Sequence, residues 1–203
     1  MGGVSVRENG IYARVKRVLD LFFSFILLFL LALPMLIIWI AVRIDSEGGG
    51  IFRQERIGRD GKPFVCYKFR TMYQSAPHNC PSARLDCPQR YITRVGRVLR
   101  RTSLDELPQL YNVLLGDMSL VGPRPLIAEE REVHRMRAEN GSYRLRPGIT
   151  GLSQISGRDT VTDSVKAELD GRYLAEFGLM QDIRILGATF GKVITGEGIE
   201  RKK

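Results

Sequence analysis

The sequence is poor in cysteine and in acidic residues, and it contains no internal repeat. Its three cysteines (Cys66, Cys80 and Cys87) are too few for a disulfide framework and favour a reducing compartment. The lack of a repeat excludes collagen-like and low-complexity chains, and a hydrophobic content of 44% excludes a disordered chain. The 203 residues are enough for one domain with a sizeable core.

The shortage of acidic residues makes the chain strongly basic. Lysine and arginine number 31 against 22 aspartates and glutamates, so the formal net charge is +9 and the isoelectric point is near 9.8. This balance favours anionic partners, which include nucleic acid, phospholipid headgroups and phosphorylated substrates.

Charge is absent from residues 21–42, a run of 22 residues near the N-terminus. As a helix this run would rise about 33 Å, which is enough to cross a bilayer. Pro34 lies inside the run and removes one helical hydrogen bond, so we expect a break there. Basic residues flank both ends and give no clear orientation. Two arrangements stay open: a kinked spanning helix, and a re-entrant segment that turns at Pro34.

The rest of the chain predicts a small, mostly helical α/β domain with short strands. Periodicity and turn signals place the strands at 51–57 and 64–70, and helices at 90–101, 164–177 and 179–195. Asp60 and Gly61 form a typical hairpin turn between the strands. Arginines at helical spacing make the 90–101 helix basic on one face, which suits headgroups or a phosphorylated ligand.

A loop is predicted at residues 74–89, which contain three prolines and many small polar residues. His78, Cys80 and Cys87 in this loop raise the alternative of a zinc site. Their spacing matches no common zinc site and a fourth ligand is missing, so solvated thiols are the simpler interpretation.

The most informative local string is R-R-T-S-L-D-E-L-P-Q at residues 100–109. Ser103 and Glu106 match a capping box, and a purely structural role for Glu106 would follow. A functional interpretation rests on the same pattern, because a helix N-terminus attracts phosphate and keeps Asp105 ionised. An ionised aspartate is a competent nucleophile towards phosphorus. Asp105 and Glu106 together can also hold Mg²⁺, which neutralises charge on a transferring phosphoryl group.

Two further segments, at 116–126 and 144–159, are dense in glycine, proline and arginine. Such loops suit the binding of phosphate through backbone N–H groups and arginine side chains. Ordinary turns are the alternative interpretation of the same composition.

These strings together resemble the bacterial sugar transferase family, the monotopic phosphoglycosyl transferases that load a sugar phosphate onto polyprenol phosphate. The matching strings are Y-K-F-R-T-M (67–72), R-R-T-S-L-D-E-L-P-Q-L (100–110), N-V-L-L-G-D-M-S-L-V-G-P-R-P (112–125) and R-P-G-I-T-G (146–151). The apolar segment with its proline matches as well, so the resemblance runs from about residue 15 to residue 198. Several long motifs in one order make it specific.

The resemblance implies roles for individual residues. Asp105 would attack the β-phosphorus of a UDP-sugar and expel UMP, and Glu106 would assist metal handling or deprotonation of the lipid phosphate. The substrate phosphates would be bound by the following residues: Lys68, Arg70, Arg100, Arg124, Arg146, Gln154 and Arg158. Pro34 would be the break of a re-entrant segment. The sequence departs from the family at Leu33, where serine is frequent, and at Leu152 and Ser156, which replace tryptophan and asparagine.

The expected organisation is a basic, re-entrant membrane segment at 1–45 and a catalytic domain at 46–203, on the cytoplasmic face of the bacterial inner membrane. The expected partners are a UDP-sugar, undecaprenyl phosphate and membrane lipid, without nucleic acid, and a homodimer is left open. The competing hypothesis is a membrane-tethered basic protein that binds nucleic acid or anionic lipid. No RNA-binding or helix-turn-helix motif supports it, and it would leave the carboxylate pair without a purpose beyond capping.

Overall fold

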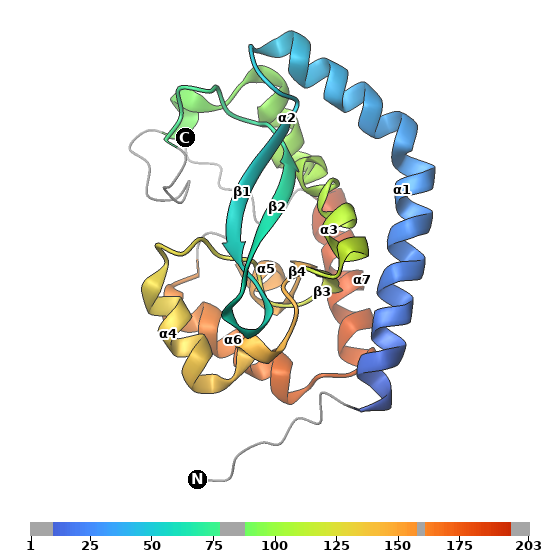
Figure 1. Cartoon of the computed structure of the whole chain (residues 1–203), viewed down its shortest axis with the longest axis vertical. Helices are drawn as coiled ribbons and strands as arrows, with labels where there is room; N and C mark the ends of the chain where they lie inside the picture. Colours follow the sequence, from blue (N-terminus) through green and yellow to red (C-terminus); the bar gives the residue numbers. More distant parts are fainter. Residues whose placement is uncertain (1–9, 78–87, 158–160, 196–203) are drawn as a thin grey trace.

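The computed structural model describes residues 10–77, 88–157 and 161–195 (Figure 1). His78, Cys80, Cys87 and Arg158 lie outside the described residues, and so do the zinc and phosphate-binding roles considered for them. The elements in chain order are α1 (Ile11–Asp45), β1 (Ile51–Ile57), η1 (Arg59–Gly61), β2 (Pro63–Phe69), η3 (Pro88–Tyr91), α2 (Arg94–Thr102), η4 (Leu104–Glu106), α3 (Gln109–Leu115), β3 (Ser119–Val121), α4 (Arg131–Asn140), η5 (Ser142–Arg144), β4 (Gly148–Thr150), α5 (Leu152–Gly157), α6 (Asp163–Ala175) and α7 (Leu179–Thr195).

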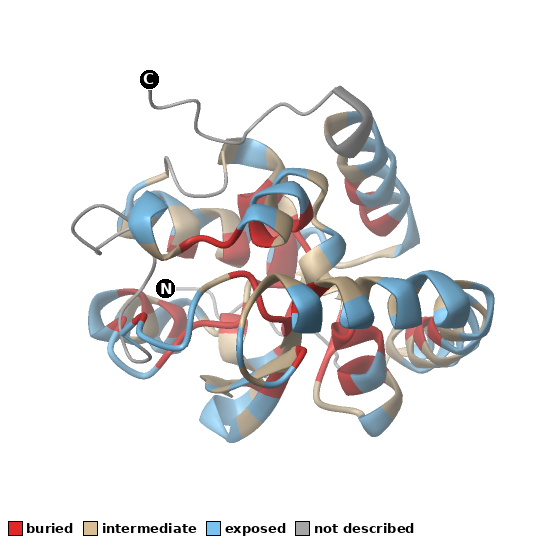
Figure 2. Ribbon diagram, turned by 90° about the horizontal axis from the view of Figure 1, so that it is seen from above, coloured by how far each residue is buried: buried red, intermediate tan, exposed pale blue. Residues whose placement is uncertain are grey.

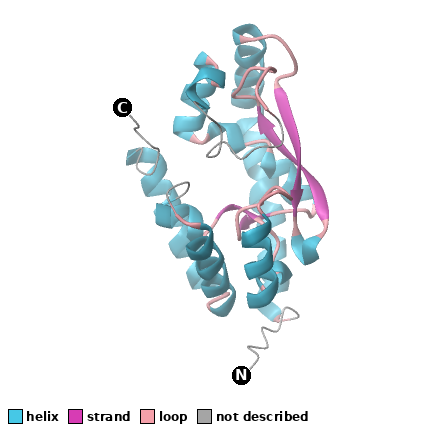
Figure 3. Ribbon diagram, turned by 90° about the vertical axis from the view of Figure 1, so that its left-hand side faces the viewer, coloured by secondary structure: helices cyan, strands magenta, loops and turns pink. Residues whose placement is uncertain are grey.

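The described chain is mostly helical with short strands, as predicted (Figure 3). β1 and β2 pair antiparallel from Ile51 opposite Phe69 to Ile57 opposite Pro63, within one residue of the predicted bounds. Asp60 and Gly61 adopt positive φ angles of 56° and 73° in the connecting turn, which explains the Asp-Gly signal. β3 and β4 form a second, parallel pair of three residues each.

The predicted helices at the C-terminus and around residue 95 are confirmed. α6 and α7 lie within two residues of their predicted bounds. α2 exposes Arg94, Arg97 and Arg101 and buries Leu99, so its basic face is outward as expected. Figure 2 shows that the buried residues gather where the helices and strands meet, while the outer helix faces are exposed.

Helix α1 is continuous over its 35 residues, with Pro34 inside it. The expected break at Pro34 is therefore corrected to a distortion within one helix. Proline removes only one backbone hydrogen bond, and the residues on both sides of Pro34 stay helical, so the helix continues past it. Figure 1 shows that α1 bends partway along its length and follows one side and the top of the domain. By length and composition α1 is the one described helix that is apolar enough to cross a membrane.

The first part of α1 is tied to the rest of the domain by buried polar side chains. Lys16 Nζ lies 2.7 Å from Asp182 Oδ2 at the start of α7, and Ser119 of β3 donates to Asp20 Oδ2 over 2.7 Å. Tyr12 and Tyr173 also donate to the Asp182 carboxylate. These contacts compensate for the burial of the charged side chains of Lys16 and Asp20.

The last part of α1 is held by apolar packing and by its C-terminal carbonyl groups. Val42 forms a buried cluster with Phe69 and Leu99. The Arg70 guanidinium donates to the carbonyl oxygens of Val42 and Ser46 at 3.2 and 2.7 Å, which satisfies groups that a helix end leaves without partners. Both ends of α1 therefore contact the same domain.

Candidate active site

Asp105 and Glu106 lie in η4, the short 3-10 turn between α2 and α3. Ser103 precedes this turn with a φ of 58°, ends α2 in the left-handed conformation and caps no N–H of η4 with its side chain. The predicted capping box is therefore wrong, because a left-handed Ser103 cannot take the extended conformation of an N-cap residue. The two acidic residues are presented by a turn and not by the first turn of a long helix.

The Glu106 carboxylate faces two cations from other parts of the chain. Lys68 Nζ, in β2, lies 2.8 Å from Glu106 Oε1, and Arg124 Nη1 lies 3.6 Å from the same oxygen. Only 12% of the Glu106 side chain is exposed, so these ion pairs are screened by solvent less than a surface pair. Asp105, the preceding residue, is partly exposed in the same turn.

A small cavity of about 10 Å³ lies at these side chains. Besides Lys68, Glu106 and Arg124, it is lined by Arg56, Cys66, Gln109, Pro125, Gly148 and Ile149. Burial and the neighbouring Arg124 cation lower the pKa of Arg56 from its ordinary value. Burial raises the pKa of the Cys66 thiol, which keeps the sulfur neutral beside Glu106. The cavity is thus a largely cationic recess that contains one glutamate, an arrangement suited to phosphate oxygens.

The loop that carries Arg124 packs backbone to backbone against the start of β4. Gly122 N donates to Thr150 O, and Gly148 N donates to Pro123 O, both over 2.8 Å. A Cβ on Gly122 would lie 2.3 Å from the Arg146 carbonyl oxygen, so only glycine permits this approach. The two glycine- and proline-rich motifs of the sequence are therefore neighbours in space, and their packing places Arg124.

Other predicted site residues lie around this recess or away from it. Arg100 donates through Nε to Thr71 Oγ1 at 2.9 Å, on the helix that precedes Asp105. Arg70 is buried and directed at the end of α1, so it is not brought together with Glu106. Arg146 donates through Nε to Gly116 O at 2.9 Å and lines a different cavity. Gln154 is buried in α5, where its Oε1 accepts a hydrogen bond from Ser153.

Arg56 and Gln109 line the Glu106 cavity but were not identified from the sequence. Arg56 lies in β1, and strand alternation alone does not distinguish it from the other basic residues near the hairpin. Gln109 directly follows the Asp105–Pro108 segment, and its place in the D-E-L-P-Q string is a signal that could have identified it. Its side chain is 2% exposed at the first residue of α3.

A buried amide and a buried ion pair position the recess. The Asn112 carboxamide accepts from Tyr67 N at 3.0 Å and donates to Val65 O at 2.7 Å, which joins α3 to the free edge of β2. Arg137 pairs with Asp170 at 2.5 Å and also donates to the Arg124 carbonyl oxygen at 2.9 Å. The strand that bears Lys68 and the loop that bears Arg124 are thus both anchored by groups outside the cavity.

Comparison with known proteins gives one consistent result. The family model described as bacterial sugar transferase matches residues 11–196. Undecaprenyl-phosphate galactose phosphotransferase of Salmonella typhimurium is 40% identical over 91% of this chain and 41% of its own length. UDP-glucose:undecaprenyl-phosphate glucose-1-phosphate transferase of Escherichia coli is 39% identical over the same shares.

The lengths of these relatives differ. The chain spans about two fifths of the Salmonella and Escherichia proteins. It covers 91% of the uncharacterized sugar transferase EpsL of Bacillus subtilis, with 38% identity over 92% of this chain. The matched region contains α1, the Asp105–Glu106 turn and the cavity beside it. The chain therefore belongs to the bacterial sugar transferase family.

Proposed function

We propose that this chain transfers a sugar 1-phosphate from a UDP-sugar to undecaprenyl phosphate, an early membrane step of glycoconjugate synthesis. The observation that carries this proposal is Glu106, held between Lys68 and Arg124 and directly next to Asp105. Members of the same family are named for undecaprenyl-phosphate galactose and glucose-1-phosphate transfer. A cationic recess lined by Glu106, with Asp105 as the preceding residue of the chain, suits a reaction that moves a phosphoryl group between anionic substrates.

In the first step, an Asp105 carboxylate oxygen attacks the β-phosphorus of the UDP-sugar. A bond forms between that oxygen and phosphorus, and the bond to the oxygen that bridges the two phosphates breaks. UMP leaves with the electron pair, and the phosphosugar stays on Asp105 as an acyl phosphate. Lys68 and Arg124, which both pair with Glu106, would neutralise charge on the phosphate oxygens during this displacement.

In the second step, an oxygen of undecaprenyl phosphate attacks the same phosphorus. The bond to Asp105 breaks, the carboxylate is regenerated, and the product is a lipid diphosphate that carries the sugar. Glu106 accepts the proton if the lipid phosphate enters as its monoanion. Because UMP has already left, the two anionic substrates do not have to occupy the recess together.

The residues present fit a Mg²⁺ ion that is shared with the substrate. No described cluster of three or more metal-ligating side chains offers a complete protein site. Mg²⁺ is commonly bound by one or two carboxylates together with substrate phosphates, and Asp105 and Glu106 supply two carboxylates. When bound, the ion would neutralise charge on the donor diphosphate and on the leaving UMP.

The surroundings of η4 suit delivery of a lipid acceptor. Leu107, the residue after Glu106, packs with Met35 and Ile38 of α1 on the cluster around Val42. The apolar end of α1 and the residue that follows the carboxylate turn therefore pack on the same apolar cluster. A polyprenyl chain that follows α1 would bring its phosphate to the protein at this end.

The packing of α1 supports a re-entrant arrangement on the cytoplasmic face. Lys16 and Asp20 near one end, and Val42 and Asp45 at the other, all contact the same domain. A helix that crossed the bilayer would place its two ends on opposite sides of the hydrocarbon region, and a domain on one side of it could not contact both ends. One domain that holds both ends favours placing both ends on one side of the membrane.

The covalent intermediate gives the sharpest test of the reaction. Full-length protein is incubated with Mg²⁺ and each of a panel of UDP-sugars, without lipid. The correct donor should release about one UMP per active site as a burst, and intact-protein mass spectrometry should show a sugar-phosphate adduct on Asp105. Asp105→Asn should abolish both, whereas Glu106→Gln should slow turnover and still permit the adduct.

The control for loss of a carboxylate is Asp60→Asn in the hairpin turn, where asparagine suits the positive φ. This variant should keep the burst. UMP release that strictly requires the lipid, with no adduct trapped on the wild type, would instead indicate direct transfer between bound substrates.

The re-entrant arrangement is tested separately with single cysteines at Ile11 and Ile44, the exposed ends of α1, in a chain without its native cysteines. These side chains are 84% and 81% exposed. A membrane-impermeant maleimide should label both in inverted vesicles and neither in intact cells. Labelling of one position from outside the cell would establish a spanning helix.

A further inference from the structure

Gln109 places a buried carboxamide at the Glu106 cavity. The side chain is 2% exposed and lines the cavity, and its carboxamide forms no hydrogen bond to any residue that the structure describes. Buried polar groups are nearly always hydrogen-bonded in folded proteins, because burial removes their bonds to water. An exception that lines a cavity is explained most simply by a bound group that supplies the missing partner.

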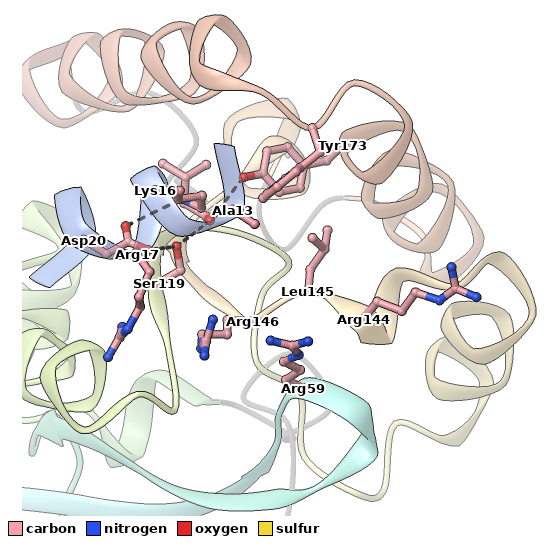
Figure 4. Close-up of a pocket in the computed structure, with 12 residues that line it drawn as sticks. Ala13, Lys16, Arg17, Asp20, Arg59, Ser119, Arg144, Leu145, Arg146 and Tyr173 are labelled. Carbon is pink, nitrogen blue, oxygen red and sulfur yellow. Dashed lines mark hydrogen bonds and ion pairs between the residues drawn. The ribbon is translucent and has the colours of Figure 1, made fainter. Parts of the chain in front are cut away.

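A second cavity, of about 50 Å³ beside the first turns of α1, shows the contrast (Figure 4). Ser119 in its wall donates to Asp20 Oδ2 over 2.7 Å, and Lys16 Nζ lies 3.6 Å from Asp20 Oδ1. These buried polar side chains are partners of one another, so they do not call for a ligand. The carboxamide of Gln109 has no such arrangement, and this distinguishes the Glu106 cavity.

The backbone around Gln109 is fixed on both sides. Tyr111 N donates to Pro108 O over 3.0 Å, so the chain enters α3 through a hydrogen-bonded turn. Asn112, three residues after Gln109, joins α3 to the edge of β2. Gln109 follows Glu106 by three residues, and both side chains line the same cavity. The carboxamide is therefore held in place before a ligand binds, which lowers the entropic cost of binding.

The other groups of the cavity indicate which ligand atom the carboxamide meets. Lys68 and Arg124 can only donate hydrogen bonds, so a group bound beside them presents acceptor oxygens. A carboxamide can donate to the same kind of oxygen through its NH₂ group. The cavity of about 10 Å³ has roughly the space of one water molecule, so it admits a single oxygen and not a sugar ring or a nucleobase. These properties fit a non-bridging oxygen of a phosphate group.

We propose that Gln109 is a further catalytic residue, whose carboxamide NH₂ group donates a hydrogen bond to a non-bridging oxygen of the β-phosphate of the UDP-sugar. This inference rests on the proposed transfer reaction and adds a neutral donor to the cations Lys68 and Arg124. While the bond to Asp105 forms and the bond to the bridging oxygen breaks, the NH₂ group keeps the β-phosphate oriented towards the attacking carboxylate.

The first test compares stability with activity. Gln109→Met keeps the length of the side chain and removes both of its hydrogen-bonding groups. Because the carboxamide has no partner among the described residues, this change should leave the urea midpoint unchanged or raise it. Initial rates of UMP release should nevertheless give a kcat about 10- to 100-fold lower, with little change in KM. If Gln109→Met does not fold, Gln109→Leu replaces it.

The matched control is Gln181→Met. Gln181 is a second buried glutamine, in α7, and it lines neither cavity. This variant should keep the kcat of the wild type. An equal loss of kcat in both variants would overturn a specific role for Gln109.

The second test identifies the oxygen. UDP-sugars with sulfur in place of one non-bridging oxygen of the β-phosphate form two diastereomers, and sulfur accepts hydrogen bonds more weakly than oxygen. With the diastereomer whose sulfur meets Gln109, the Gln109→Met change should have little further effect on kcat. With the other diastereomer it should keep its full effect of about 10- to 100-fold. A merely structural role would give the same loss with both.

The outcomes separate this inference from the proposed reaction. An unchanged kcat in Gln109→Met, or an equal loss with both diastereomers, would overturn the role of Gln109 while UMP release by the wild type still supported the transfer. A urea midpoint that falls together with kcat would assign Gln109 a structural role and overturn the proposal. Absence of UMP release by the wild type with every UDP-sugar, with or without lipid, would overturn the transfer reaction and this inference together.

Discussion

Lys68 Nζ lies 2.8 Å from Glu106 Oε1 and joins β2 to the turn that carries both acidic residues. Lys68 is itself anchored, since the next strand residue back, Tyr67, donates its N–H to Asn112. The ion pair directs the Glu106 carboxylate into the recess and brings a positive charge to the place where substrate phosphate is expected. Lys68 is thus both a partner of Glu106 and a candidate phosphate ligand.

Replacement of Lys68 should reduce catalysis more than stability. Lys68→Met removes one charge-assisted hydrogen bond, which contributes about 1.5–3 kcal/mol, so kcat/KM should fall about 10- to 100-fold. Lys68→Arg keeps the charge, so its kcat/KM should fall less than that of Lys68→Met. UMP release under initial-rate conditions measures both variants, and an unchanged kcat/KM in Lys68→Met would contradict a role for this cation.

Replacement of Asn112 should destabilise the fold. Asn112→Ala leaves Tyr67 N–H and Val65 C=O without their side-chain partner at a buried strand edge. An unsatisfied buried polar group costs about 1–3 kcal/mol, so we expect the free energy of unfolding to fall by about 2–4 kcal/mol. Asn112→Asp keeps the acceptor for Tyr67 but buries a carboxylate against Val65 O and beside Asp117, so it should lose at least as much stability as Asn112→Ala. Urea unfolding in detergent measures the unfolding free energy of the wild type and the two variants. Equal stability of all three would show that the Asn112 hydrogen bonds do not stabilise the fold.

Removing one partner of the Arg137–Asp170 ion pair should lower the free energy of unfolding more than removing both partners. Arg137→Met leaves a buried carboxylate without its cation, and such changes cost about 3–5 kcal/mol. Arg137→Met with Asp170→Leu should recover most of that loss, because no charge is left buried. A double-mutant cycle on the unfolding free energies gives the coupling. Additive single-variant effects would show that the pair is not coupled.

The same substitution at two helical glycines should have opposite effects. A Cβ on Gly96 would lie 2.1 Å from the Thr71 carbonyl oxygen, so Gly96→Ala must force α2 away from residue 71 and destabilise the protein. A Cβ on Gly187 in α7 would meet nothing within 4 Å. Gly187→Ala should therefore stabilise by about 0.5–1 kcal/mol through helix propensity. Thermal unfolding of both variants provides the comparison.

The Cys66 thiol should make stability depend on pH in the alkaline range. Burial raises its pKa above the ordinary value of 9.0, so the unfolded chain releases this proton at lower pH than the folded chain. The contribution is fully present below pH 9 and is lost as pH rises through the raised pKa. The stability difference between wild type and Cys66→Ala should shrink between pH 8 and pH 10, as measured by urea midpoints. A constant difference would show that the pKa is not raised.

The sequence predicts those parts of the fold that local patterns determine. β1, β2, α6 and α7 were found within two residues, because alternation, the Asp-Gly turn and helical periodicity act over neighbouring positions. The Asp105–Glu106 pair was identified through its motif. The partner of Glu106 was not predictable from spacing, since Lys68 lies 38 residues away and only the packing of β2 against η4 brings them together.

Two differences between expectation and structure have simple physical reasons. The family resemblance places Arg70 with Lys68 among the phosphate-binding residues, but β2 ends at Phe69. Arg70 therefore lies beyond the strand, and its side chain turns to the carbonyl groups at the end of α1. The capping box at Ser103 has the right residue types, but α2 ends directly before it and places Ser103 in the left-handed conformation.

The contact between the first and the last helix determines when folding can be completed. Lys16 and Asp182 are 166 residues apart in sequence. The turn of α1 that carries Lys16 therefore leaves the ribosome long before Asp182 of α7 is synthesised. Pairing over such a distance is slow compared with formation of the helices themselves. We therefore expect the apolar part of α1 to meet the bilayer while Lys16 is still in water, and synthesis of α7 to be the event that draws Lys16 into the domain. Asp20 can pair earlier, because its partner Ser119 lies in β3.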